Sequence, residues 1–392
     1  MDKGRDMITR RERSPFNLSG ARPVNIARMR LSNQHLAKQS LDDPADVVRR
    51  LGAVQAQDYS AAKWGVAQRT RGATDAIVEQ ALNDGAIIRT HVLRPTWHFV
   101  VPADLRWMLA LTAPRVRALS AYYDRQLELT DVLFRRSNAA LTKALQGGCS
   151  LTRTELTRVL ERAKIGATGT QRVGHLLMRA ELDAVICSGP RRGKQSTYAL
   201  LEERVLPAKA KLRDEALAEL ARRYFATRGP ATAHDFAWWS GLTVTDSTKA
   251  IRMLETELEQ VSVDEKTCWL AAGDRALKVT APNAHLLPNY DEYFIGYRDR
   301  SAIGKIVAVN PVDRTNVIFA GHVIVVNGQL VGGWKREIVR DGVTINLTIV
   351  TPIKETERRA ITAAARRYGK FLGVTATIAG IKAQRRSTFS PP

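Results

Sequence analysis

Residues 150–186 read SLTRTELTRVLERAKIGATGTQRVGHLLMRAELDAVI, and they predict two short helices followed by a strand. Thr152 and Glu155 have the spacing of a capping box, so we expect the first helix to begin there. The GATGT stretch breaks this helix, and a second begins near Gly169 or Thr170 with apolar residues at helical spacing. A hairpin follows, with the strands LDAVIC and TYALL on either side of the turn SGPRRGKQS. This order of elements is typical of a winged helix.

Residues 230–263, PATAHDFAWWSGLTVTDSTKAIRMLETELEQVSV, repeat this order with little identity of residues. Thr232 opens a helix that carries Asp235 in its first turn, the stretch SGLTVT interrupts it, and Asp246 starts a second helix. The strands EQVSV and CWLAAG complete the copy. A period longer than about 50 residues indicates duplicated domains rather than a solenoid.

The two ends of the chain carry less regular signals. The N-terminal part fits a third copy less closely: it predicts a series of helices, one with Pro44 in its first turn, and two strands within 87–101 that separate near Pro95. In the C-terminal part, Asn327-Gly328 between two apolar runs is the strongest hairpin signal. Residues 354–373 predict a helix that Gly373 ends.

We therefore predict an α+β fold class, with three tandem winged-helix modules plus a C-terminal β-rich/α module. The predicted divisions are a disordered basic arm at 1–21, winged-helix modules at 22–125, 126–206 and 207–280, and the C-terminal module at 281–392.

Charge is the most unusual feature of the composition. The 392 residues include 60 Lys and Arg against 39 Asp and Glu, a net charge of +21. Such an excess concerns binding partners rather than the fold. Because no run approaches the ~18 apolar residues of a membrane span, and the N-terminus lacks the apolar segment of a secretory signal, we expect a nucleic-acid partner and no membrane.

The cysteines and glycines exclude several chemistries. Cys149, Cys187 and Cys268 are odd in number and outside any CxxC spacing, which indicates a reducing cytoplasm and neither a disulfide framework nor a zinc site. The sequence contains no HExxH, no GxxxxGK[ST] loop and no GxGxxG after a strand. We therefore expect no metal and no nucleotide cofactor.

Five stretches carry a resemblance to a known family. They are QAQD at 55–58, RPTWH at 94–98, DFAWWSGL at 235–242, LLPNYDEYFIGYRDR at 286–300 and VVNGQLVGGWKR at 325–336. In this order they resemble the tandem winged-helix proteins of the AlkZ-like DNA glycosylase family, over about residues 24–385. Members of that family excise alkylated purines, and some unhook interstrand crosslinks, with catalysis assigned to a Gln-x-Gln or Gln-x-Asp motif.

The resemblance implies that Gln55 and Gln57 are the catalytic residues. It also implies support from Thr96 and His98, although Pro95 stands where the family commonly has Gly, and Pro fixes φ and removes a donor. Asp58 is an alternative to the glutamines, because a carboxylate polarises water more strongly, but its position favours a role as a helix N-cap or first-turn residue.

Two amides are sufficient if the substrate is already activated. An N7-alkylguanine or N3-alkyladenine carries positive charge and leaves as a neutral base, so no strong general acid is needed. An amide carbonyl can face the positive charge that develops on the sugar, and an amide can hold the attacking water. Residues i and i+2 share a face only in an extended segment, so the sequence predicts that Gln55 and Gln57 are not helical.

Other residues are candidates for binding or for packing. Arg191, Arg192 and Lys194 lie at the predicted wing tip, where we expect phosphate contacts, the alternative being a merely solvated turn. Trp238 and Trp239 are predicted as core residues rather than stacking platforms. The stretch Asp291-Glu292-Tyr293 either orients the site or attaches the C-terminal module through ion pairs.

The resulting prediction is a monofunctional DNA glycosylase that acts without a cofactor on double-stranded DNA with alkylated purines. Lyase activity is not expected, because Lys63, the nearest lysine, is predicted to lie on a helix. The alternatives are a non-enzymatic winged-helix DNA-binding protein or transcription regulator, and a hydrolase of another nucleoside-like substrate. We expect a cytoplasmic, nucleoid-associated monomer.

Overall fold

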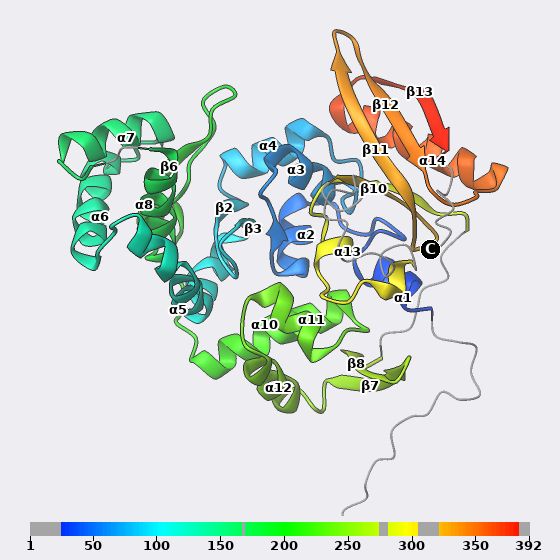
Figure 1. The fold of residues 1–392 in the computed structure, drawn as a ribbon, viewed down its shortest axis with the longest axis horizontal. Coiled ribbons are helices and arrows are strands. Elements are labelled where there is room, and N and C mark those ends of the chain that lie inside the picture. Colours follow the sequence, from blue (N-terminus) through cyan, green and yellow to red (C-terminus); the bar gives the residue numbers. More distant parts are fainter. Residues whose placement is uncertain (1–24, 167–168, 274–280, 305–320, 384–392) are drawn as a thin grey trace, which may run out of the picture.

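The computed structural model describes residues 25–166, 169–273, 281–304 and 321–383, and Figure 1 shows their arrangement. Helices and strands alternate irregularly, which confirms the predicted α+β class. None of the described helices combines the length and the apolar run needed to cross a bilayer. The predicted basic arm at 1–21 lies outside the described residues.

The N-terminal part builds a three-stranded antiparallel sheet, in the order β1-β3-β2, among five helices. Its elements are α1 (Ile26–Asn33), α2 (Pro44–Leu51), β1 (Val54–Gln55), α3 (Tyr59–Ala67), α4 (Asp75–Asn83), β2 (Ile88–His91), β3 (Trp97–Val100) and α5 (Pro102–Gln126). Asp43 caps α2 and Pro44 opens it, as predicted. Pro114 lies within α5, which continues past it to Gln126.

The second part contains the two helices and the hairpin predicted from residues 150–201. Its elements are α6 (Asp131–Leu145), β4 (Leu151–Thr152), α7 (Arg153–Arg162), α8 (Thr170–Leu182), β5 (Ile186–Ser188), β6 (Thr197–Leu200) and α9 (Leu201–Arg204). The capping box of Thr152 and Glu155 is present at the start of α7. The predicted strand at 182–187 was wrong at its start, because Leu182 still belongs to α8 and the turn after it includes Ala184 at φ 57°.

The third part repeats the pattern. Its elements are α10 (Arg213–Arg228), α11 (Ala233–Ser240), α12 (Val244–Met253), β7 (Leu258–Val263) and β8 (Lys266–Ala271). Thr232 is the N-cap of α11 and Asp235 lies in its first turn, as predicted, and the two side chains form a capping box. Asp246 does not start α12, which begins at Val244. It is the third residue of the helix and forms a capping box with the N-cap residue Thr243. In both copies the chain just before the first helix pairs with the second hairpin strand, through β4 with β6 and through Ala231 with Trp269.

The C-terminal part is a five-stranded sheet in the order β13-β12-β11-β10-β9, with only β12 and β13 parallel. Its elements are β9 (Ala284–Leu287), α13 (Glu292–Ile295), the 3-10 helix η1 (Ser301–Ile303), β10 (His322–Val326), β11 (Gln329–Val339), β12 (Gly342–Ile349), α14 (Glu355–Leu372) and β13 (Thr375–Ala383). Asn327 and Gly328 form the predicted hairpin between β10 and β11, and Gly373 ends α14 at φ 71°.

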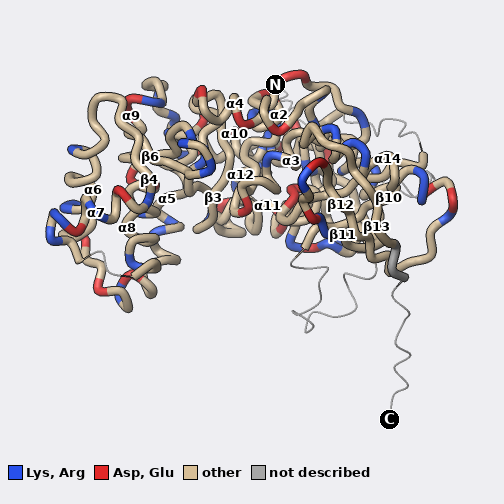
Figure 2. The backbone as a smooth tube through the Cα atoms, turned by 90° about the horizontal axis from the view of Figure 1, so that it is seen from above, with Lys and Arg blue, Asp and Glu red and all other residues tan. Residues whose placement is uncertain are grey.

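Buried apolar residues join parts that the sequence separates. One core combines α5 with α10, α11 and α12, and another combines α2 and α3 with the C-terminal sheet and α14. The second part has a core of its own. Lys and Arg positions are spread along the molecule from α6 and α7 at one end to β11–β13 at the other (Figure 2).

One buried histidine makes stability depend on pH. His285 on β9 is buried, and burial, with Arg367 and Arg69 nearby, lowers its pKa to about 3. Between the unfolded value of about 6.5 and this folded value, only the unfolded chain binds the proton, so stability falls as the pH falls. We expect this residue to reduce the free energy of unfolding by about 2 kcal/mol between pH 7.5 and pH 5.

Urea unfolding at the two pH values measures this difference in the wild type and in His285→Leu. The leucine cannot titrate, so the variant should lose less stability on acidification, by about the same 2 kcal/mol. An equal loss in the two proteins would show that His285 does not carry the effect.

Candidate active site

The Gln-x-Gln segment is extended, as the catalytic reading requires. β1 pairs with β3 so that Gln55 lies opposite His98, and the Ala56 N–H donates to the Trp97 carbonyl at 2.7 Å. The segment ends at Asp58, whose side chain accepts from the Ala61 N–H and caps α3. Gln55 is buried at 8 % exposure, whereas Gln57 is exposed.

Both amide carbonyls accept hydrogen bonds from the chain that enters β3. Arg94 donates through Nη2 to Gln55 Oε1 at 2.7 Å, and the Trp97 N–H donates to Gln57 Oε1 at 3.4 Å. Within the described part of the chain, neither amide NH₂ group has a hydrogen-bond acceptor. Because a carbonyl oxygen has two lone pairs, each amide keeps two donors and one acceptor position for a ligand.

Gln55 lines a cavity of about 310 Å³ between the N-terminal, third and C-terminal parts. The cavity walls are Gln55, Arg94, Pro95, Thr96, Trp238, Pro288, Asn289, Tyr290, Phe294, Ile295, Arg300, Gly321 and Val323. Gln57 is not among them, so of the two amides only that of Gln55 faces this cavity.

The two adjacent tryptophans have different surroundings. Trp239 is fully buried in the core, as predicted, but the same prediction was wrong for Trp238, which is 45 % exposed and lines the cavity. Its indole is held by a hydrogen bond from Nε1 to the Ile295 carbonyl at 3.1 Å. Gly241 ends α11 at φ 71°, where a Cβ would collide with the Leu93 carbonyl, so α11 packs directly against the β2–β3 loop.

Thr96 and His98 occupy two different positions. Thr96 lines the cavity, and its hydroxyl has no partner among the described residues. His98 is fully buried behind β1, with Nδ1 2.9 Å from the Thr96 carbonyl. Burial, reinforced by Arg94, lowers the pKa of His98 well below its usual value. The neutral imidazole therefore donates from Nδ1 and is not a general acid at neutral pH.

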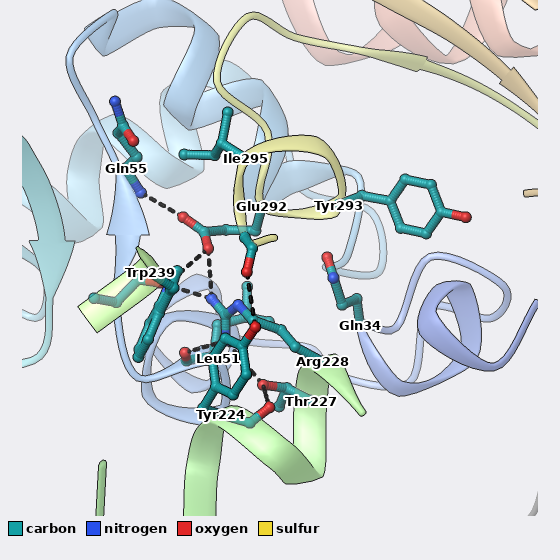
Figure 3. A network of polar contacts seen from close by, with 12 residues as sticks. Gln34, Leu51, Gln55, Tyr224, Thr227, Arg228, Trp239, Glu292, Tyr293 and Ile295 are labelled. Atoms are coloured by element: carbon teal, nitrogen blue, oxygen red, sulfur yellow. Dashed lines mark hydrogen bonds and ion pairs between the residues drawn. The ribbon is translucent and has the colours of Figure 1, made fainter. Parts of the chain in front are cut away.

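Glu292 connects α13 to the Gln-x-Gln segment (Figure 3). Its Oε1 accepts from the Gln55 backbone N–H at 2.8 Å. Its Oε2 accepts from Arg228 Nη2 at 2.6 Å and from Trp239 Nε1 at 2.9 Å. Glu292 and Arg228 are completely buried. Glu292 lies within a motif of the sequence, whereas no motif or spacing marks Arg228.

Asp291 forms a second buried ion pair beside the first. Its two oxygens accept from Arg69 Nη1 at 2.9 Å and Nη2 at 2.8 Å, and both side chains are 1 % exposed. Tyr293 donates its hydroxyl to the Gly328 carbonyl at 2.9 Å. Residues 291–293 were expected either to orient the site or to attach the C-terminal module. Asp291 and Tyr293 have the second of these roles.

The basic tip between β5 and β6 is partly occupied by contacts within the chain. Arg191 lies 3.5 Å from Glu79 and has its guanidinium over the Tyr59 ring. Arg192 donates to Glu155 at 2.8 Å and to the Ser150 carbonyl at 2.7 Å. Lys194 is exposed and makes no ion pair with another described residue. Its charged group is therefore the most available of the three for a phosphate.

The α+β fold, the basic charge and the extended Gln-x-Gln segment are the features expected of a DNA glycosylase of the AlkZ type. The family model described as "DNA glycosylase AlkZ-like" matches residues 48–371, and the chain belongs to this family. The resemblance noted in the sequence is thereby confirmed.

Two comparisons identify a particular relative in Streptomyces sahachiroi. The chain is 29 % identical over 353 residues to an interstrand DNA cross-link repair glycosylase of that organism, covering 85 % of this chain and 91 % of the relative. It also superimposes on the solved structure of Streptomyces sahachiroi DNA glycosylase AlkZ with a TM-score of 0.75 at 25 % identity, over 92 % of this chain and 98 % of the other.

Proposed function

We propose that this protein hydrolyses the N-glycosidic bond of cationic alkylated purines in double-stranded DNA, N7-alkylguanine and N3-alkyladenine, and that it unhooks interstrand crosslinks. The relative named as a cross-link repair glycosylase supports the second part. The observation that carries the proposal is the Gln55 amide, which lines a cavity while Arg94 and Glu292 hold its side chain and backbone.

The proposed reaction uses electrostatics rather than proton transfer to the base. Alkylation makes the base a cation that leaves as a neutral molecule. Positive charge then grows on the deoxyribose, where the amide oxygen of Gln55 or Gln57 is a fixed dipole that stabilises it. The other amide holds the water that adds to C1′, and the proton that this water loses passes to the solvent. Undamaged bases lack this activation, so the same site spares them.

We assign Gln55 and Gln57 the catalytic role and Thr96 a supporting one at the cavity wall. Two earlier candidates receive other roles in this proposal: Asp58 caps α3, and His98 packs behind β1. Lys63 supports a monofunctional reaction, because its ammonium group is buried and paired with Asp75 at 2.8 Å and Glu79 at 2.6 Å. A lysine held in this way is not available as a Schiff-base nucleophile.

The test is release of free base from methylated plasmid DNA by the purified protein. We expect 7-methylguanine and 3-methyladenine in the supernatant, and strand breaks only after alkali or heat. Breaks without such treatment would contradict the monofunctional reaction. No base release, together with preferred binding to one sequence, would favour the transcription-regulator alternative. We further propose that the protein acts as a monomer at the nucleoid.

We predict that the β5–β6 tip contributes to DNA affinity. Lys194→Ala should reduce the slope of log K against log salt concentration by about 0.9, the value for one phosphate contact. Arg191→Ala and Arg192→Ala should have smaller effects, because their guanidinium groups already have partners within the chain. Titration of labelled duplex at several salt concentrations measures the slope. Three unchanged slopes would remove this tip from the DNA-binding surface.

A further inference from the structure

We propose that Glu292 is a positioning residue for catalysis, which rests on the proposed role of Gln55. Its carboxylate fixes the backbone from which the Gln55 amide reaches the cavity. The two residues are 237 positions apart in the chain and meet only in the folded protein. Figure 3 shows the Gln55 side chain directed away from Glu292, so the carboxylate binds the backbone and leaves the amide free for substrate.

The polar groups that contact the two oxygens of Glu292 are all hydrogen-bond donors, so this position requires a carboxylate rather than another polar group. Oε1 accepts from the Gln55 N–H, and Oε2 accepts from Arg228 and Trp239. An ionised carboxylate is an acceptor only, so both oxygens can be used at once. An amide of the same shape would turn an NH₂ group toward Gln55 or toward the Arg228–Trp239 pair. Glu292→Gln is therefore expected to displace the Gln55 backbone.

Arg228 extends this arrangement to the chain that leads into β1. Besides its ion pair with Glu292, it donates to the Leu51 carbonyl at 2.8 Å and to the Ala53 carbonyl at 3.2 Å. Its guanidinium also lies 4.3 Å from the centre of the Trp239 ring. The connection from α2 to Gln55 is thus held by one buried pair whose members come from α10 and α13.

The neighbouring pair provides a matched control. Asp291 and Arg69 are buried to the same degree as Glu292 and Arg228, and Asp291 also caps α13. No hydrogen bond from Asp291 reaches Gln55 or Gln57 among the described residues. Asp291→Asn therefore tests the loss of a buried charge next to the site, whereas Glu292→Gln adds the loss of the Gln55 contact.

The experiment compares single-turnover excision of 7-methylguanine, DNA affinity and thermal unfolding. We expect both variants to unfold at lower temperature and to bind DNA as the wild type does. Only Glu292→Gln should slow excision, by about 10- to 100-fold, the range that misplacement by about 1 Å produces. Equal rates in the two variants would overturn the proposal.

A double-mutant cycle separates this inference from the proposed function. If Glu292 acts through Gln55, then Glu292→Gln should change the residual rate of Gln55→Ala by less than about threefold. Independent, multiplying effects of the two changes would reject the positioning role while leaving Gln55 catalytic. Wild-type activity in Gln55→Ala alone would instead reject the proposed function.

A variant that preserves the fold covers the case in which Glu292→Gln does not fold. The double change Arg228→Met, Glu292→Met replaces the buried pair by apolar residues, which is often tolerated. It leaves the Gln55 N–H without an acceptor, so we expect a folded protein with the same slow excision. A folded double variant that excises at the wild-type rate would overturn the proposal.

Discussion

Gln55→Ala should reduce the single-turnover rate of 7-methylguanine excision by about 100-fold or more, the usual effect of removing one preorganised group from a transition-state site. Its amide is the one that lines the cavity, and Arg94 holds its carbonyl in a single orientation. Alanine removes the dipole without changing the strand, because β1 pairs with β3 through the backbone. The double variant with Gln57→Ala should show no measurable excision.

Two control variants give this prediction its specificity. Gln80→Ala removes the same kind of side chain from an exposed position on α4, outside the cavity, and should excise normally. Asp58→Asn should also stay active, because asparagine caps a helix as well as aspartate does. A larger decrease in excision rate for Asp58→Asn than for Gln57→Ala would assign the catalytic role to the Asp58 carboxylate. Steady excision by the Gln55, Gln57 double variant would refute the mechanism.

Arg69→Met should lower the free energy of unfolding by about 3–5 kcal/mol, the effect of leaving one buried charge without its partner. Arg69 and Asp291 are both 1 % exposed, and Arg69 also donates to the Gln34 and Gly65 carbonyls. Removing the guanidinium leaves the Asp291 carboxylate and these carbonyls short of donors in the interior. Denaturant unfolding followed by tryptophan fluorescence measures the change.

An exposed ion pair is the matched control for this prediction. Arg71 and Asp42 make two hydrogen bonds of 2.6 Å, but their side chains are 57 % and 75 % exposed. Water solvates either charge when the other is removed, so Arg71→Met should lower stability far less than Arg69→Met does. Similar losses in the two variants would mean that burial of the Arg69–Asp291 pair does not set its importance.

Local features of the structure followed from neighbouring residues. The capping boxes at Thr152 and Thr232, the turn at Asn327-Gly328 and the cap at Gly373 are each formed by residues within a few positions of one another. Their geometry depends on backbone conformation and short hydrogen bonds, so a sequence can specify them. Asp246 shows the usual error in an element boundary: it was predicted to start α12, which begins two residues earlier at Val244.

The candidate site was predictable only in part. Gln55 and Gln57 were found through a motif, and the extended backbone that they require is present. Trp238 was wrongly assigned to the core, because tryptophans that are adjacent on a helix point in different directions, and the sequence does not show which side is covered. The cavity and its wall residues from α11 and from the chain around α13 could not be predicted, because they meet across three parts of the fold.

The order of helices and hairpins, the basic charge and the family membership are properties of the sequence, since they depend on short-range pattern, composition and motif. Which amide faces the cavity, and which charges are buried, is decided by tertiary packing. The Gln55–Glu292 and Arg69–Asp291 contacts join residues 237 and 222 positions apart. Contacts at such separations arise when shared hydrophobic cores dock the C-terminal part on the N-terminal one, and that docking places Gln55 at the cavity wall.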